Sequence, residues 1–183
     1  MPPAPSPDHP HPRPYHLQHL IEEFRALPAD SDRRREIVAK LDGDVEALPF
    51  LISVVADPQE YDLARVEAAT LLRLWPPSDP VAARTAAQAL LAALRDPEED
   101  LVRQYAAAAL GPYADEPSVH EALTATVLED DDPLVRHNAL SAVEEAGPSE
   151  ARTGLLRALA HDPDLGVAAA RTLREWGRES DAR

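Results

Sequence analysis

Three arginines occupy matching positions in a recurring phrase, and their guanidinium groups are the side chains with the clearest potential chemistry in this sequence. Arg65, Arg103 and Arg136 each follow an Asp-Pro dipeptide, with an acidic spacer in the first two copies, and each precedes an alanine-rich apolar run. A guanidinium recognises carboxylates and phosphates through its planar set of N–H donors. Because each arginine stands directly before an apolar run, we expect it to form a structural ion pair with a nearby acid.

Acidic runs and histidines are the other groups that could hold an ion. The runs at 98–100 and 129–132 lack the alternating ligands and central glycine of a calcium-binding loop, and acids in a first helical turn favour the helix dipole. His16 and His19 share a helix face, but no third ligand is evident. No phosphate-binding loop, nucleophile elbow or zinc-protease motif occurs. We therefore predict no metal site, no cofactor and no catalytic residues, which indicates a protein that is not an enzyme.

Composition narrows the range of partners. The 183 residues carry a formal net charge of −15, which opposes binding to nucleic acid or to anionic membranes and suits a basic protein partner. There is no cysteine, no apolar run long enough to span a membrane, and no basic-then-apolar start typical of a secretory signal. These features favour the cytoplasm. Of the 18 basic residues only Lys40 is a lysine, a bias typical of a GC-rich bacterial genome.

The arginine phrase is one part of a longer internal repeat. Positions 65, 103, 136 and 167 correspond, so the steps are 38, 33 and 31 residues. A period in this range is the signature of stacked helical repeats, each too small to bury its apolar side alone. In the fourth copy Val167 replaces the arginine, so any series of ion pairs should stop there.

Hydrophobic spacing and helix-stop signals divide the chain into helix pairs. Five apolar residues between 17 and 27 follow one helical face, whereas no stretch alternates as a strand would. Pro49 lies inside an expected first helix and should bend it. The predicted organisation is a disordered proline-rich tail at 1–14, an atypical capping helix pair at 15–43, four repeats over 44–177 and a disordered tail at 178–183. The expected helices of the four repeats are 44–56 and 59–75, 79–95 and 98–111, 117–129 and 133–146, and 149–161 and 164–177.

The phrases at 57–72, 96–110, 132–143 and 162–173 resemble HEAT-like repeats of the PBS-lyase type. The resemblance implies an all-α, right-handed α-solenoid of about five stacked antiparallel helix pairs, with a proline kink in first helices. It also implies an arginine ladder, in which Arg65, Arg103 and Arg136 pair with acids near Asp57, within 96–100 and within 130–132.

In this type of repeat the second helices line the concave side. Residues that face outward there are the candidates for binding a partner, and Tyr105 is the best anchor because an aromatic ring with a polar tip is favoured at interfaces. The candidate set is Glu67, Thr70, Arg73, Gln104, Tyr105, His137, Asn138, Ser141 and Glu144.

Three classes of function remain open. The leading hypothesis is a non-catalytic scaffold or adaptor for protein–protein interaction, including an inhibitor or immunity-type binder of a basic protein. The alternative is a chaperone-like or lyase factor for a tetrapyrrole chromophore, which the resemblance to phycobilin lyases suggests. A DNA-repair role is the third, and the negative charge opposes it. The sequence leaves the partner and the oligomeric state open.

Overall fold

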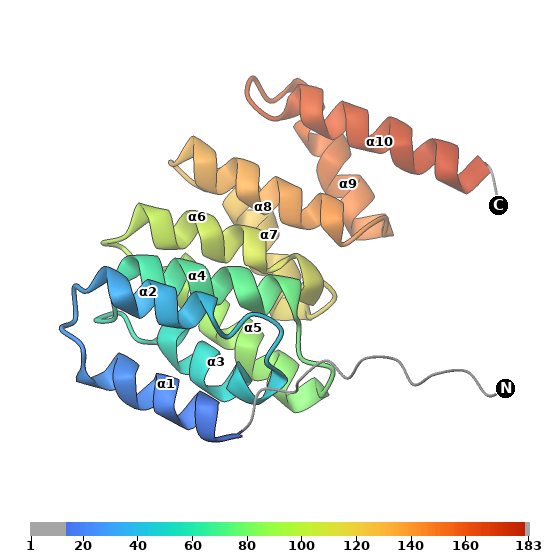
Figure 1. Ribbon diagram of the computed structural model, residues 1–183. Helices are drawn as coiled ribbons and strands as arrows, with labels where there is room; N and C mark the ends of the chain where they lie inside the picture. Colours follow the sequence, from blue (N-terminus) through green and yellow to red (C-terminus); the bar gives the residue numbers. More distant parts are fainter. Residues whose placement is uncertain (1–13, 182–183) are drawn as a thin grey trace, which may run out of the picture.

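The computed structural model describes residues 14–181, and its helices pack as consecutive pairs along the chain (Figure 1). Within these residues the structure contains α-helices and short 3₁₀ turns, and no strand. The α-helices are α1 (Pro14–Ala26), α2 (Asp32–Ala39), α3 (Leu48–Ala56), α4 (Asp62–Leu74), α5 (Pro80–Leu94), α6 (Asp100–Ala109), α7 (Pro117–Glu129), α8 (Pro133–Glu145), α9 (Glu150–Ala158) and α10 (Gly166–Asp181). The 3₁₀ turns are η1 (Val45–Ala47), η2 (Gly111–Tyr113) and η3 (Leu159–His161).

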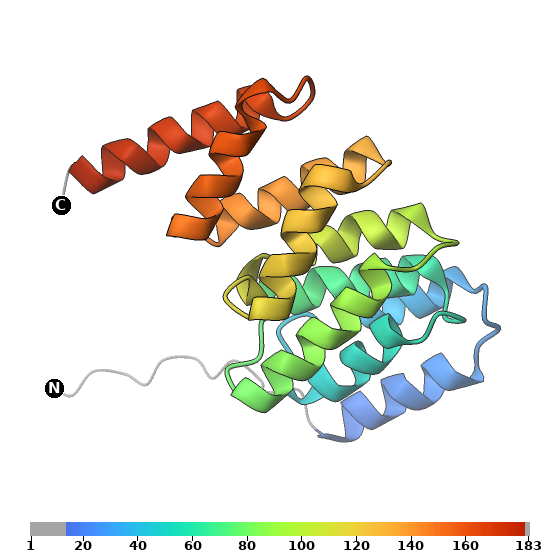
Figure 2. The same cartoon turned by 180° about the vertical axis from the view of Figure 1, so that it is seen from behind.

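The helices form two layers. The second helices of the pairs, α2, α4, α6, α8 and α10, follow one another on the side facing the viewer in Figure 1, and the reverse view in Figure 2 shows α5, α7 and α9 in front. Contacts from α2 through α4 and α6 to α8 are extensive, whereas α5 and α7 of the other layer touch only sparsely. The fold is therefore the expected all-α solenoid of stacked helix pairs.

Small buried residues explain how the second helices approach so closely. Ala68, Ala106 and Ala139 are fully buried at equivalent positions of α4, α6 and α8. Leucine and valine fill the space between the layers, and the buried apolar cluster continues from Leu17 in α1 to Ala169 in α10. Burial is thus spread along the stack, as in repeat proteins whose units shield their neighbours.

Several expected helix boundaries are wrong. Pro49 does not bend a helix, because α3 begins at Leu48 and the proline lies in its first turn, where no N–H is needed. The residues before it form η1, whose cap Asp44 accepts a hydrogen bond from the Glu46 amide. The second helices α4 and α6 begin at Asp62 and Asp100, later than expected.

The two ends of the chain differ from expectation in different ways. The expected end of the last helix at Gly177 is too early, because α10 continues to Asp181. Its last residues therefore belong to a helix and not to a tail that starts at 178. The proline-rich tail expected over 1–14 lies outside the described residues except for Pro14, which begins α1.

Candidate functional site

Arg65, Arg103 and Arg136 form a ladder in which each arginine pairs with an aspartate of the following repeat. The aspartate lies in the loop before the next second helix, beside the arginine of the preceding second helix. Each of these ion pairs, which we call a rung of the ladder, therefore joins two repeats. The pairs are Arg65 with Asp96 at 2.7 Å, Arg103 with Asp130 at 2.5 Å and Arg136 with Asp162 at 2.5 Å. Asp57 is not a partner of Arg65, because its carboxylate accepts from the Gln59 amide.

Each ladder arginine also fixes the helix before it. Its Nε donates to a backbone carbonyl near the end of the first helix of the same pair, a group that the helix itself leaves unsatisfied. The acceptors are Val55 for Arg65, Leu94 for Arg103 and Val127 for Arg136. One guanidinium therefore ties together two helices of its own repeat and the loop of the next.

The rung formed by Arg65 and Asp96 is the most deeply buried. Their side chains are 2% and 7% exposed. Burial alone would raise the pKa of Asp96, but hydrogen bonds from Arg65 and from the amides of Glu98 and Glu99 outweigh it, and the pKa is lowered. Asp96 is therefore held as a carboxylate inside the stack.

Arg34 adds a rung that the sequence analysis missed. It pairs with Glu60 at 2.5 Å, donates to the Leu27 carbonyl, and lies 4.6 Å from the centre of the Phe24 ring. The Asp-Pro phrase is absent here, but Arg34 precedes the buried Ile37 by three residues, the same spacing as in the later repeats. That spacing is the signal that could have identified it.

Gly166, and not Val167, stands at the arginine position of the last repeat. Fully buried Ala169 follows Gly166 by three residues, as Ala68 follows Arg65, whereas Val167 is exposed. A Cβ atom at Gly166 would lie 3.0 Å from the carbonyl oxygens of both Leu159 and Ala160. The ladder ends as expected in the fourth copy, but the substitution responsible is one residue earlier.

Most of the polar residues predicted to bind a partner also make contacts between second helices, and their role in binding stays a prediction. These residues lie on the second-helix layer, as predicted. Hydrogen bonds and ion pairs between their side chains and other second helices hold the helices in register. The interhelical contacts are Glu67 with Arg35 at 3.3 Å, Gln104 with Asp132 at 3.0 Å, Asn138 with the Gln104 carbonyl at 3.0 Å, Arg73 with Glu145 at 2.8 Å, and Glu144 with Thr172 and Arg171. Thr70 and His137 bond within their own helices, to the carbonyls of Val66 and Pro133.

An apolar patch remains exposed on the same layer. Tyr105 is 42% and Leu134 is 59% exposed, and Leu101 lies one turn before Tyr105 on α6. The Gln104–Asp132 bond places the starts of α6 and α8 side by side. We call Leu101, Tyr105, Leu134 and the exposed Ser141 the α6–α8 surface.

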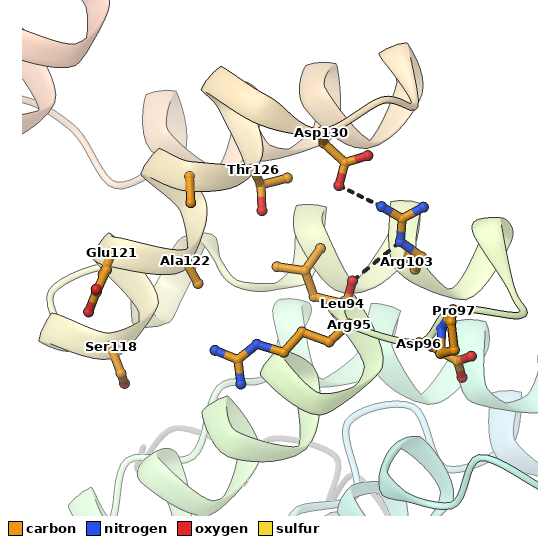
Figure 3. Close-up of a pocket in the computed structure, with 11 residues that line it drawn as sticks. Leu94, Arg95, Asp96, Pro97, Arg103, Ser118, Glu121, Ala122, Thr126 and Asp130 are labelled. Atoms are coloured by element: carbon orange, nitrogen blue, oxygen red, sulfur yellow. Dashed lines mark hydrogen bonds and ion pairs between the residues drawn. The ribbon is translucent and has the colours of Figure 1, made fainter.

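A groove opens in the other layer, between the end of α5 and α7 (Figure 3). Its volume is about 650 Å³. The lining comes from α5, the loop after it, α6 and α7, and consists of Leu94, Arg95, Asp96, Pro97, Arg103, Ser118, Glu121, Ala122, Ala125, Thr126 and Asp130. We call this cavity the α5–α7 groove.

Residues that could bind metal do not gather in the described part of the chain, where no group of three or more His, Asp or Glu side chains is placed to hold an ion. Across residues 14–181, no helix has the length and apolar character needed to cross a membrane.

Stacked helix pairs joined by an ion-pair ladder define the class of this protein as an α-solenoid of helical repeats. Residues 87–174 match the family model for HEAT repeats, and this match supports the HEAT-like character of the repeats. HEAT repeats generally mediate protein–protein interaction and are typically non-catalytic scaffolds. Comparison with curated proteins and with solved structures gives no significant match.

Proposed function

We propose that this protein is a non-catalytic adaptor or inhibitor that binds a basic protein through the α6–α8 surface. The observation that carries the proposal is the exposure of Leu101, Tyr105 and Leu134 on two helices held in register. Protein interfaces combine an apolar centre with a polar rim, and tyrosine is enriched among the residues that contribute most to affinity. The bonded side chains around this patch supply a rigid rim.

Charge supports a cationic partner. The chain carries a net charge of −15. Asp131 lies exposed in the loop before α8, near the α6–α8 surface. Asp100 and Asp164 are exposed as well, although each also pairs with a ladder arginine, at 3.0 and 3.4 Å. An acidic rim steers a basic partner toward the apolar centre and disfavours acidic competitors.

A pull-down from native lysate tests the proposal when it is paired with surface variants. We expect the wild-type protein to retain a basic protein at low salt and less of it at moderate salt, because exposed charges are screened. The double variant Tyr105→Ala/Leu134→Ser should lose this protein. Leu128→Ser is the matched control, since Leu128 is also exposed but lies on α7 in the other layer.

Two results would count against this function. One is recovery of no protein at either salt concentration. The other is equal retention by the double variant and the control, which would place the contact elsewhere. The tetrapyrrole alternative is supported by the repeat type alone, and none of the described residues adds to that support.

A further inference from the structure

The first-helix layer is open between α5 and α7. Contacts between α3 and α5 are extensive and those between α5 and α7 are sparse, although α6 and α8 behind them pack closely. The α5–α7 groove occupies this opening, and its volume of about 650 Å³ lies within the range of ligand-binding clefts. It is on the opposite layer from the α6–α8 surface.

Four polar side chains of the groove, Arg95, Ser118, Glu121 and Thr126, have no hydrogen-bond or ion-pair partner among the described residues. Arg95 ends α5 and extends into the groove without an ion pair, and the Thr126 side chain is directed toward the groove without a hydrogen bond (Figure 3). Thr126 is only 9% exposed. The Thr126 hydroxyl forms no hydrogen bond within the protein and is open to the groove, so it offers a place for a ligand atom.

The other charges of the groove are largely balanced. Asp96 and Asp130 pair with Arg65 and Arg103 of the ladder. Leu94, Ala122 and Ala125 form an apolar lining between them. Glu121 on α7 also lines the groove and has no ion-pair partner, so its negative charge disfavours a segment with more than one acidic group.

We propose that the α5–α7 groove binds a short, extended segment of a partner protein that carries one acidic side chain, with the carboxylate on Arg95. A guanidinium binds a carboxylate through two parallel N–H donors, and the Thr126 hydroxyl donates to a backbone carbonyl of the segment. The lining runs along α7 from Ser118 to Asp130, about 18 Å at 1.5 Å per residue. An extended chain of about five residues covers that length.

This site goes beyond the proposed function, because it gives the protein a second contact with the opposite charge preference. A basic partner on the α6–α8 surface and an acidic segment in the α5–α7 groove use different layers and share no residue. The two sites together would make the chain a bridge between two proteins.

Amide chemical shifts in ¹⁵N-labelled protein test the proposal with defined probes. The first probe is the peptide acetyl-Ala-Leu-Glu-Ala-Leu-amide, and the second has Gln in place of Glu. We expect shifts at residues 94–96 and 118–126, and about threefold tighter binding of the Glu peptide, the size of an exposed ion pair. Arg95→Gln should remove that preference. Thr126→Val should weaken both peptides equally.

Arg84→Gln is the matched control, since it removes an exposed arginine from the same helix outside the groove and should leave the preference unchanged. Absence of shifts in the groove at millimolar peptide would overturn the proposal. Equal affinity of the two peptides for the wild type, or a preference that survives Arg95→Gln, would also overturn it. None of these outcomes bears on the α6–α8 surface, whose variants leave the groove intact.

Discussion

The Arg65–Asp96 rung and the Arg73–Glu145 pair are chemically alike and lie in different surroundings. Both join a guanidinium on α4 to a carboxylate of a later repeat, at 2.7 and 2.8 Å. The rung is almost fully buried, whereas Arg73 and Glu145 are 41% and 36% exposed. The N–O distance is therefore nearly the same in the two ion pairs. The difference in solvent access should decide how much each pair contributes to stability.

Solvent acts on the two pairs in opposite ways when one partner is lost. Water can replace Arg73 beside an exposed Glu145, so little is lost. Water cannot easily reach Asp96, so removing Arg65 leaves an uncompensated charge inside the stack. A single substitution in the buried ladder should therefore lower the free energy of unfolding strongly. A substitution in the exposed pair should change it only slightly.

The largest expected effect comes from Arg65→Met. We expect the free energy of unfolding, measured with urea, to fall by about 3–5 kcal/mol because Asp96 stays buried without its cation. Arg103→Met should cost less, since Arg103 is more exposed and its partner Asp130 can be hydrated. If both substitutions cost the same, burial would not be the property that ranks the rungs.

Gly166→Ala tests whether close packing against the backbone takes the place of an arginine ion pair in the last repeat. A Cβ atom would lie 3.0 Å from two carbonyl oxygens of the preceding turn, and those atoms cannot rotate away. We expect a loss of about 1–3 kcal/mol in the free energy of unfolding, as for other overpacked sites. Gly154→Ala is the control, because no atom lies within 4 Å of its Cβ position in α9. That change should stabilise the helix by about 0.5–1 kcal/mol.

Local repeats in the sequence were enough to predict the solenoid, since the Asp-Pro phrase and the buried alanines recur in every unit from α4 onward. The phrase did not identify which acid each arginine would meet. That choice depends on the offset between successive repeats, which places Asp96 under Arg65 and leaves Asp57 in its own turn. Arg34 was missed because its acceptor is Glu60 and not an Asp-Pro aspartate.

The α5–α7 groove was beyond sequence reasoning for a different reason. In the sequence, Arg95 and Thr126 resemble ordinary helix residues. Only the separation of α5 from α7 shows that Arg95 reaches into a groove and that the Thr126 hydroxyl has no acceptor there. The polar residues predicted to bind a partner show a second limit of the sequence. Their spacing predicts that they face outward, but contacts such as Gln104–Asp132 depend on where the neighbouring helix lies.

Acidification should weaken the ladder gradually. The pKa of Asp162 is lowered chiefly by the Leu165 amide and further by Arg136, and that of Asp96 is lowered despite burial. Because the folded pKa lies below the unfolded value of about 3.9, the stabilisation is complete above that pH and is lost as the pH falls through the folded pKa. Urea unfolding of Asp162→Asn should show a smaller acid-induced loss than the wild type. Equal losses would mean that Asp162 does not contribute to acid sensitivity.

The smallest expected effect is the coupling between Arg73 and Glu145. A double-mutant cycle with Arg73→Ala and Glu145→Ala should give about 0.2–1 kcal/mol, decreasing with salt. Gly111 permits this contact, because a Cβ there would lie 2.8 Å from Glu145 Oε2. The tip of the glutamate can swing aside, so Gly111→Ala should abolish the coupling at little further cost. A coupling that instead survives Gly111→Ala, or one as large as the loss in Arg65→Met, would show that exposure does not distinguish the two kinds of pair.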